Sequence, residues 1–225
     1  IQLYSFLSEV KKKYRLAKFT LDSVTTNPKK TLLDLQQFDL AIIAKPTQAF
    51  TENEKLVLDQ YIINGGKTLW MIENVQADTD SLYTNGSMLA YPRDLNLTDF
   101  FFAYGLRVNA TLLQDLYAAK IPLATGNLGN KPQFQNLSWF YHPLVLGNPN
   151  HAISKNILPV RLRFANQIDT LQNNLKKTPL LMSSMLTKKV GTPAIIELNS
   201  IAKEPKEEEY STGFQITGLL TEGVF

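Results

Sequence analysis

The pattern of apolar and polar residues is clearest between Phe38 and Ile72, where it predicts a strand, a helix and a second strand. Leu40 to Ala44 is a short apolar run with few polar breaks, typical of a strand covered on both faces. Lys45-Pro46 ends this run, because proline disfavours continued regular pairing. Thr68 to Ile72 is a second run of the same kind. The order predicts a right-handed crossover between two parallel strands.

Local signals mark both ends of the helix between these strands. Thr51 and Glu54 have the spacing of a capping box, in which each side chain bonds a free backbone N–H at a helix start. Asn64-Gly65-Gly66 lets the chain leave the helix through a positive φ. A helix is therefore expected to begin near Thr51. Its apolar face has near-helical spacing and consists of Leu56, Leu58, Tyr61, Ile62 and Ile63.

Three weaker patterns precede this unit. Leu3 to Tyr14 is amphipathic with a helical period, Leu16 to Leu21 alternates like a strand, and Leu32 to Gln37 is helical. Residues 1–75 therefore predict a doubly wound core, in a flavodoxin-like fold with a mostly parallel sheet and helices on both faces.

The rest of the chain is expected to complete one α/β domain over residues 1–225. Many glycines and prolines predict a loop-rich insertion over residues 76–150, with a helix at Leu97–Tyr104, N-capped by Asn96 or Thr98, and a strand at Ala118–Leu123. Residues 151–225 are strand-rich. The segments are Val160–Phe164, Leu180–Met182, Ala194–Leu198 and Phe214–Leu220, with a turn at Pro205–Glu209 between the last two. That last pair is expected to form an antiparallel hairpin.

Composition narrows the possible functions. The 225 residues are 44% hydrophobic and contain no cysteine, which excludes disulfides, thiolate metal sites and a cysteine nucleophile within them. The net charge of +3 comes from scattered lysines, so nucleic-acid binding is not indicated. The strongest run, Lys11-Lys12-Lys13, fits a solvated helix face better than an anionic partner site. No apolar run approaches the roughly 20 residues that cross a bilayer. Because the chain opens at Ile1 directly into a helix, we expect a first strand or a membrane anchor to lie outside it.

Candidate site residues lie mainly beside predicted strand ends. Glu73 and Asn74 follow the second strand, at the edge where open α/β sheets bind ligands; they either hold a substrate or cap the next loop. Asp115 and Trp139 either line a groove or serve in capping and packing. His142 lies next to a turn-forming proline, so it is either a loop or packing histidine or an acid-base group.

Other motifs carry little chemistry. His142 and His151 are the only histidines and lack a metal-binding spacing, so no metal is predicted. Ser183-Ser184 follows a strand, where turn hydrogen bonding is favoured over a nucleophile. Gly126-Asn127-Leu128-Gly129 lacks the lysine of a phosphate loop and fits a surface turn. No catalytic residue and no cofactor are therefore assigned.

Several stretches spread over nearly the whole chain resemble one family. They are Ile43–Thr47 with Phe50-Thr51, Leu58–Ile62 with Asn64–Trp70, Asp94–Thr98 with Tyr104–Val108 and Leu113–Asp115, Thr178–Leu181 with Ser183-Ser184, and Leu219–Gly223 with Phe225. In these stretches the chain is similar to the GldG-type auxiliary component of the ABC-type transport system associated with gliding motility.

The resemblance implies a periplasmic region of an inner-membrane protein, anchored by transmembrane helices outside this chain. Its partners would be the membrane and ATPase subunits of an ABC transporter, with an envelope saccharide or protein as a further ligand. The implied fold is similar to class I glutamine amidotransferases, whose catalytic cysteine has no counterpart here, since Glu73 follows the corresponding strand. The activity is therefore not carried over.

Three function classes follow from these observations. The leading hypothesis is a non-catalytic auxiliary or binding domain, which predicts an exposed apolar groove with Trp139 or Tyr141 at its edge. An enzyme, such as a hydrolase of envelope polymers, would need Glu73, Asp115 or His142 to converge in one cleft. The third class is a purely structural component of the motility and secretion assembly.

Overall fold

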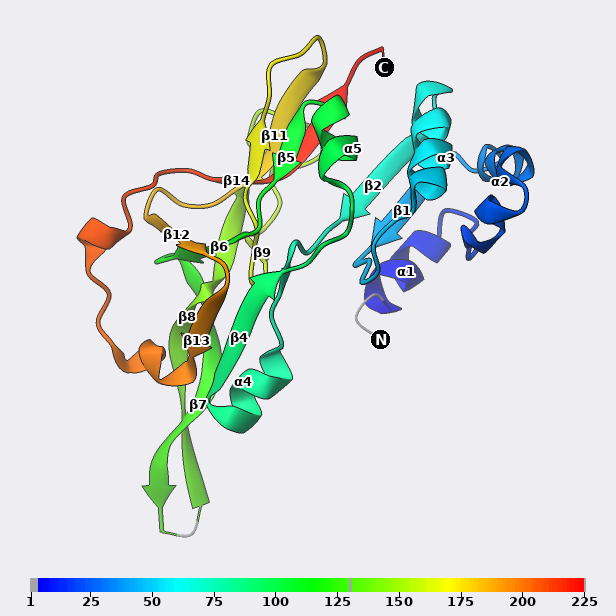
Figure 1. Cartoon of the computed structure of the whole chain (residues 1–225). Helices are drawn as coiled ribbons and strands as arrows, with labels where there is room; N and C mark the ends of the chain where they lie inside the picture. The colour runs from blue at the N-terminus through cyan, green and yellow to red at the C-terminus, as the bar shows by residue number, and fades with distance from the viewer. Residues whose placement is uncertain (1–3, 130, 225) are drawn as a thin grey trace. The chain divides into compact units, whose positions relative to one another are not determined.

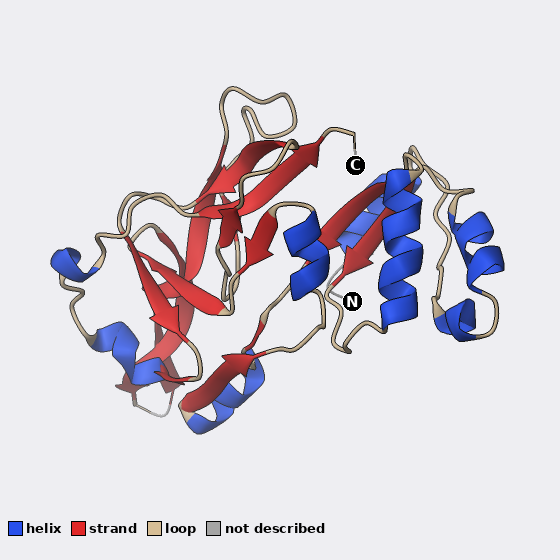
Figure 2. Cartoon of the chain, turned by 45° about the horizontal axis from the view of Figure 1, so that its top comes forward, coloured by secondary structure: helices blue, strands red, loops and turns tan. Residues whose placement is uncertain are grey.

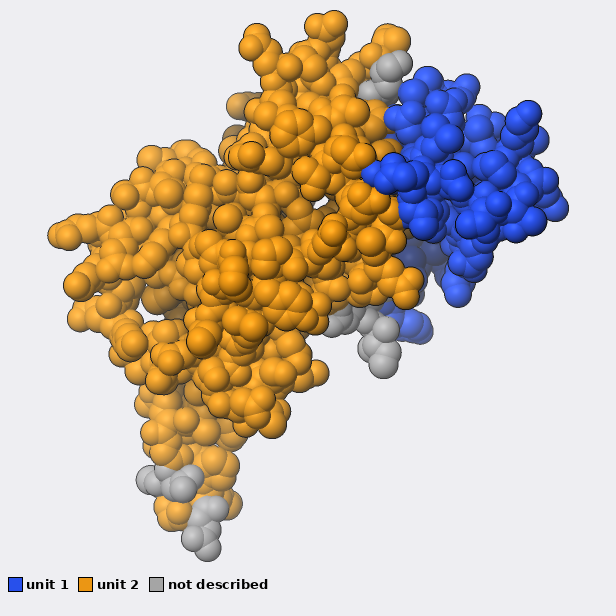
Figure 3. Space-filling model, viewed as in Figure 1, with its two compact units in different colours: residues 1–41, 51–68 blue, residues 42–50, 69–225 orange. Residues whose placement is uncertain are grey.

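The structure is a computed structural model that describes residues 4–129 and 131–224. Its backbone contacts divide the chain into two units (Figure 3). Unit 1 comprises residues 1–41 and 51–68, and unit 2 comprises residues 42–50 and 69–225. Whether the whole chain acts as one domain stays a prediction.

A capping residue marks where the second helix of unit 1 begins. The amphipathic pattern near the start of the chain forms α1 (Tyr4–Lys11). The next helix, α2 (Pro28–Leu35), begins at Asn27, whose side chain accepts a hydrogen bond from the Lys30 backbone N–H at 3.0 Å. Proline is favourable in the first turn, where its missing N–H leaves no bond unmade. The helix therefore starts four residues before the apolar segment that predicted it.

The strand predicted at Leu16–Leu21 does not form. Phe19 packs edge-on against Phe38, with ring centroids 5.9 Å apart, so part of the alternating pattern does face other side chains. No described strand pairs with this segment, and an extended chain without a neighbour has no ladder of hydrogen bonds. The chain turns instead into a 3₁₀ helix, η1 (Asp22–Thr25).

The predicted strand–helix–strand unit is confirmed. It consists of β1 (Leu40–Ala44), α3 (Glu52–Ile63) and β2 (Lys67–Met71), and β1 pairs with β2 in parallel. The Thr51 backbone N–H donates to Glu54 Oε2 at 2.7 Å, and the Glu54 N–H donates to Thr51 Oγ1 at 3.3 Å, which completes the capping box.

Two glycines and a tyrosine close this unit at the end of α3. Gly65 has a φ of +92°, and a Cβ atom on Gly66 would lie 2.4 Å from the Tyr61 ring. The Tyr61 hydroxyl donates to the Phe38 carbonyl at 2.8 Å. Tight packing against the tyrosine thus explains why the second glycine is needed.

The predicted flavodoxin-like fold is wrong. The parallel sheet has two strands only, whereas most of the 37% of residues in strands pair in antiparallel fashion (Figure 2). Leu40 in β1 and Leu69 in β2 are exposed, so these strands are not covered on both faces. The two parallel strands and the helix between them were predicted correctly, but no further parallel strand extends their sheet among the described residues.

Unit 2 begins with an antiparallel sheet of three strands. They are β3 (Val75–Gln76), β4 (Ser87–Pro92) and β13 (Ala194–Glu197), with β4 in the centre. The helix α4 (Thr79–Asn85) precedes β4; it is capped by Asp78 and ends at Gly86, which has a φ of +72°.

A larger, curled sheet contains the longest strands. Its order is β14-β11-β8-β7, and β9 also pairs with β8. Strands β7 and β8 form a hairpin that extends beyond the other strands as a two-stranded arm (Figure 1). These strands are β7 (Ala118–Leu128), β8 (Lys131–Gly147), β9 (Val160–Arg161), β11 (Lys176–Met182) and β14 (Ile216–Glu222).

Strands therefore occupy much of residues 76–150, which we expected to be rich in loops. The turn predicted at Gly126–Gly129 falls at the end of β7, and Gly129, with a φ of +63°, begins the hairpin turn. Asn130, which follows, lies outside the described residues, as does Phe225 of the last stretch that carries the family resemblance.

Two further antiparallel pairs and one helix complete unit 2. The strand β6 (Thr111–Asp115) pairs with β12 (Thr187–Gly191), and β5 (Leu106–Val108) pairs with β10 (Ile168–Thr170). The predicted helix near Leu97–Tyr104 is α5 (Thr98–Ala103). Two 3₁₀ helices, η2 (Leu198–Ala202) and η3 (Glu207–Glu209), lie between β13 and β14.

The predicted C-terminal hairpin is also wrong. Its two segments are β13 and β14, but β13 pairs with β4 and β14 pairs with β11. The antiparallel direction was predicted correctly, while the partner of each strand is distant in sequence.

The core of unit 2 joins several of these sheets. Trp139 and Tyr141 of β8 pack together, with ring centroids 5.4 Å apart. They belong to a buried cluster that also contains Val75, Leu82, Met88, Ala90, Leu112, Ile121, Phe164 and Ile196. Over the described residues, no helix has the length and apolar character needed to span a bilayer.

Candidate functional site

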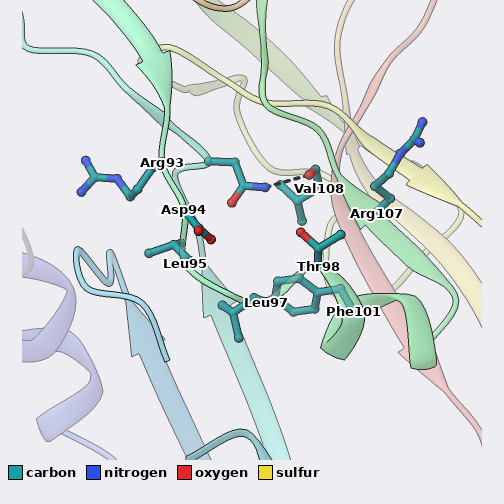
Figure 4. A pocket seen from close by; sticks show the side chains of 9 residues that line it. Arg93, Asp94, Leu95, Leu97, Thr98, Phe101, Arg107 and Val108 are labelled. Atoms are coloured by element: carbon teal, nitrogen blue, oxygen red, sulfur yellow. Dashed lines mark hydrogen bonds between the residues drawn. The ribbon is translucent and has the colours of Figure 1, made fainter. Parts of the chain in front are cut away.

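A small polar cavity lies in unit 2 just beyond the end of β2 (Figure 4). Its volume is about 40 Å³, which is room for a few water molecules or one small polar group. It is lined by Asn74, Arg93, Asp94, Leu95, Leu97, Thr98, Phe101, Arg107 and Val108. One predicted site residue, Asn74, therefore lines a cavity near a strand end, although the sheet there is not the predicted one.

Asn74 holds three segments of the chain together around this cavity. Its backbone N–H donates to Asn166 Oδ1 at 2.9 Å, and its side-chain amide donates to the Val108 carbonyl at 2.7 Å. Its carbonyl accepts a hydrogen bond from the Arg93 N–H at 2.8 Å. The asparagine is thus part of the framework that shapes the cavity.

A strained loop forms the opposite wall. Asn96 has a φ of +53°, a left-handed conformation that asparagine tolerates better than most residues. Its N–H donates to Asp94 Oδ1 at 2.9 Å, and its side-chain amide donates to the Phe50 carbonyl at 2.8 Å. Asn96 therefore fixes the loop and is not the N-cap of α5. The N-cap position is held by Leu97, which makes no side-chain capping bond, so neither Asn96 nor Thr98 is the N-cap residue.

The two arginines of the cavity point away from its centre. In Figure 4 their guanidinium groups lie on opposite sides, with Asp94 and Thr98 between them. Arg107 pairs with Asp169 at 2.7 Å. Burial raises the pKa of Asp169, but hydrogen bonds from Arg107 and Asn109 outweigh this and hold it below its ordinary value. Arg93 Nε is buried, and no described residue accepts a hydrogen bond from it.

Glu73 lies next to this cavity in sequence but does not line it. Its carboxylate pairs with Lys45 Nζ at 3.1 Å, and both side chains are partly exposed. An ion pair of this kind contributes little to stability.

Asp115 is a fully buried carboxylate at the end of β6. It accepts hydrogen bonds from the Tyr117 N–H at 2.8 Å, the Ser184 N–H at 2.8 Å and the Ser184 hydroxyl at 2.6 Å. The Ser183 hydroxyl accepts a bond from the Gln215 N–H at 2.8 Å. Both serines therefore take part in turn and loop hydrogen bonds, as the sequence favoured.

Trp139 and Tyr141 are core residues and do not border an exposed groove. Trp139 is 2% exposed and Tyr141 is 7% exposed. The groove that the binding hypothesis predicted at these residues is therefore not found there. Burial also raises the pKa of the Tyr141 hydroxyl.

His142 is a buried histidine in β8 with no polar partner. It is 3% exposed, it packs edge-on against Phe164 with ring centroids 5.5 Å apart, and no described residue bonds either imidazole nitrogen. Burial, followed by the charges of Arg163 and Arg161, lowers its pKa to about 4. The imidazole is thus neutral near pH 7 and packs as an apolar ring.

The structure does not bring the three acid-base candidates together. No hydrogen bond or ion pair joins Glu73, Asp115 and His142, and each has different neighbours. Among the described residues, no group of histidine and acidic side chains could hold a metal ion. The residues that sequence reasoning missed are Arg93, Asp94, Thr98 and Arg107. Asp94, Thr98 and Arg107 lie in stretches that carry the family resemblance. That resemblance was the signal in the sequence that could have identified them.

The fold is that of a mixed α/β protein with one parallel crossover and curled antiparallel sheets. The polar residues of the candidate site mainly make hydrogen bonds that hold loops and strands together. A family model described as "ABC-type uncharacterized transport system" matches residues 1–225. The chain belongs to this family of auxiliary components of ABC-type transport systems.

Two other comparisons add little. No curated protein matches the chain. One solved structure, described as the mmIFT52 N-terminal domain, is similar at 17% sequence identity and a TM-score of 0.49. The match covers 84% of this chain and 68% of that one.

Proposed function

We propose that this chain is a non-catalytic, protein-binding domain of an ABC-type transport system linked to gliding motility. In this proposal it lies on the periplasmic face of the inner membrane and contacts the membrane and ATPase assembly of the transporter. Family membership supports the transport role. The GldG-type stretches quoted above support the link to motility and the periplasmic side.

The structural roles of the three candidate acid-base residues support a non-catalytic function. Asp115 is saturated by three donors, Glu73 is paired with a lysine, and His142 is buried among apolar atoms. A general acid or base needs an accessible proton and a partner that tunes its pKa for the reaction. These three residues serve packing and hydrogen bonding instead.

The β7–β8 arm is the element we assign to partner contact. Residues 131–136 of β8 are all exposed, and Phe134 is 62% exposed. An aromatic side chain on a protruding hairpin offers apolar area without disturbing the core. The arm therefore suits contact with another protein.

Crosslinking and pull-down of the full-length protein test this proposal. We expect transporter subunits to be recovered with the native protein and to be reduced by Phe134→Ala. Ile195→Ala is the matched control, since Ile195 is 72% exposed but lies on β13. Absence of transporter subunits from the native pull-down would contradict the transport contact, and an equal loss in both variants would contradict the role of the arm.

The periplasmic placement has its own test. The 225 residues contain no cysteine, so a single cysteine placed at exposed Lys203 is a unique label site within them. We expect a membrane-impermeant maleimide to label it in spheroplasts. Labelling only after lysis of the inner membrane would place the domain on the other side.

A further inference from the structure

The first helix of unit 1 presents apolar side chains that the described structure covers only in part. No residue of α1 is buried. Phe6 and Leu7 are each 39% exposed, and Val10 is half-buried. At helical spacing these three side chains share one face, while Ser5, Ser8 and Glu9 lie on the other. Tyr4 and Tyr14 are exposed at either end of this segment.

A dense group of cations, whose sequence pattern predicted a solvated helix face, follows the apolar face. The helix α1 ends at Lys11, so Lys12 and Lys13 lie beyond it. Residues 11–18 contain five basic residues, Lys11, Lys12, Lys13, Arg15 and Lys18, and no acidic one. Residues 4–18 have one acid, Glu9, so their net charge of +4 exceeds the +3 of the whole chain. Of the five cations, only Lys12 has an ion-pair partner among the described residues, and that partner is Glu9 at 2.6 Å.

We propose that Tyr4–Lys18 is a docking segment for the surface of an anionic lipid bilayer. An amphipathic helix beside a cluster of four to eight basic residues has the two features that bind such surfaces. The apolar face enters the boundary between headgroups and acyl chains, and the lysines extend their charged ends to lipid phosphates.

The terminal tyrosines favour a membrane over an acidic protein surface. Tyrosine is enriched at the level of lipid headgroups, because its ring is apolar and its hydroxyl is polar. Four cations on one short segment have no ion-pair partner in the described part of the chain. They match a continuous layer of phosphates, and no pocket is needed to receive them. The segment thus complements an anionic bilayer in both charge and polarity, independently of which transporter the protein serves.

Vesicle co-sedimentation of the 225-residue chain tests this inference. We expect binding to phosphatidylcholine vesicles that contain phosphatidylglycerol, weaker binding at about 0.15 M salt than at low salt, and little binding to pure phosphatidylcholine. Each basic residue near an anionic surface contributes about fivefold, so Lys11→Gln, Lys12→Gln and Lys13→Gln together should weaken binding by about 100-fold.

Two further variants separate this segment from net charge. Lys155→Gln, Lys203→Gln and Lys206→Gln together remove the same charge from exposed positions elsewhere and should leave binding nearly unchanged. Phe6→Ser with Leu7→Ser keeps every charge and should weaken binding at least tenfold; circular dichroism checks that the fold is retained. Equal losses in both lysine variants, or no binding of the native chain to anionic vesicles at low salt, would overturn the inference.

Discussion

Two regions of this protein, residues 38–72 and residues 76–225, differ in how far apart in sequence their paired segments lie. The first region is a single crossover whose strands are separated by one helix, and its ends are fixed by a capping box and two glycines. In the second region, β13 pairs with β4, β12 with β6 and β14 with β11. Each of those pairs joins strands that are distant in sequence. Local signals therefore define the first region. In the second region the β7–β8 hairpin is local, while long-range pairing and burial define most of the other strand pairs.

The largest effect is expected from truncating the core of the second region. Trp139→Ala should lower the free energy of unfolding by about 3–5 kcal/mol, because it removes a nearly fully buried indole and leaves a cavity. Urea denaturation measures the change. A loss below about 1 kcal/mol would mean that Trp139 is not a core residue. The prediction that it borders an exposed groove would then hold.

Asp115→Ala should cost about 3 kcal/mol, because two backbone N–H groups and one hydroxyl lose their buried acceptor. The same denaturation experiment gives the value. Glu73→Gln is the matched control and should change stability by less than about 0.5 kcal/mol, since its ion pair is exposed. If the two variants lost equal stability, the structural role given to Asp115 would be wrong.

His142 should make stability depend on pH. Its pKa is about 4 in the folded protein and about 6.5 in the unfolded chain, so the unfolded chain binds the proton more readily. The stability present above pH 6.5 is therefore lost as the pH falls towards 4, by up to about 3 kcal/mol.

Unfolding measured from pH 7 to pH 4 checks this dependence. His142→Leu should flatten that part of the curve. If His142→Leu left the pH dependence of stability unchanged, other groups would be the cause of the stability loss at low pH.

The smallest effect is expected in the first region. Thr51→Ala removes one half of the capping box and should cost about 1 kcal/mol. Amide hydrogen exchange of α3 measures the loss locally, and exposed Thr47→Ala serves as the control. Unchanged exchange in α3 would mean that packing alone, and not the cap, holds this helix.

Sequence reasoning succeeded where a signal and its consequence lie within a few residues. Thr51 and Glu54 are three residues apart, and Gly65-Gly66 follows Asn64, the C-cap of the helix. The alternation at Leu16–Leu21 failed as a strand prediction because a strand also needs a neighbour, which no local pattern supplies. The C-terminal hairpin failed for the same reason.

The candidate site shows the same division. Asn74 was singled out from its place after a strand, and it does line the cavity. The other walls, including Asp94, Thr98 and Arg107, come from α5, β5 and the loop before them. Only the resemblance to a family drew attention to these stretches, because their meeting depends on hydrogen bonds such as Asn74 to Val108.

The sequence by itself determined the β1–α3–β2 crossover, the family of the chain and the dense cations that follow α1, since each depends on neighbouring residues or on similarity along the chain. The tertiary structure alone decided that the sheets are mainly antiparallel, that Trp139 and His142 are buried, and that Asp115 serves as an internal acceptor. Those properties depend on which distant strands pair and which side chains they cover. The free energy that selects them arises from burial and hydrogen bonding across the whole fold.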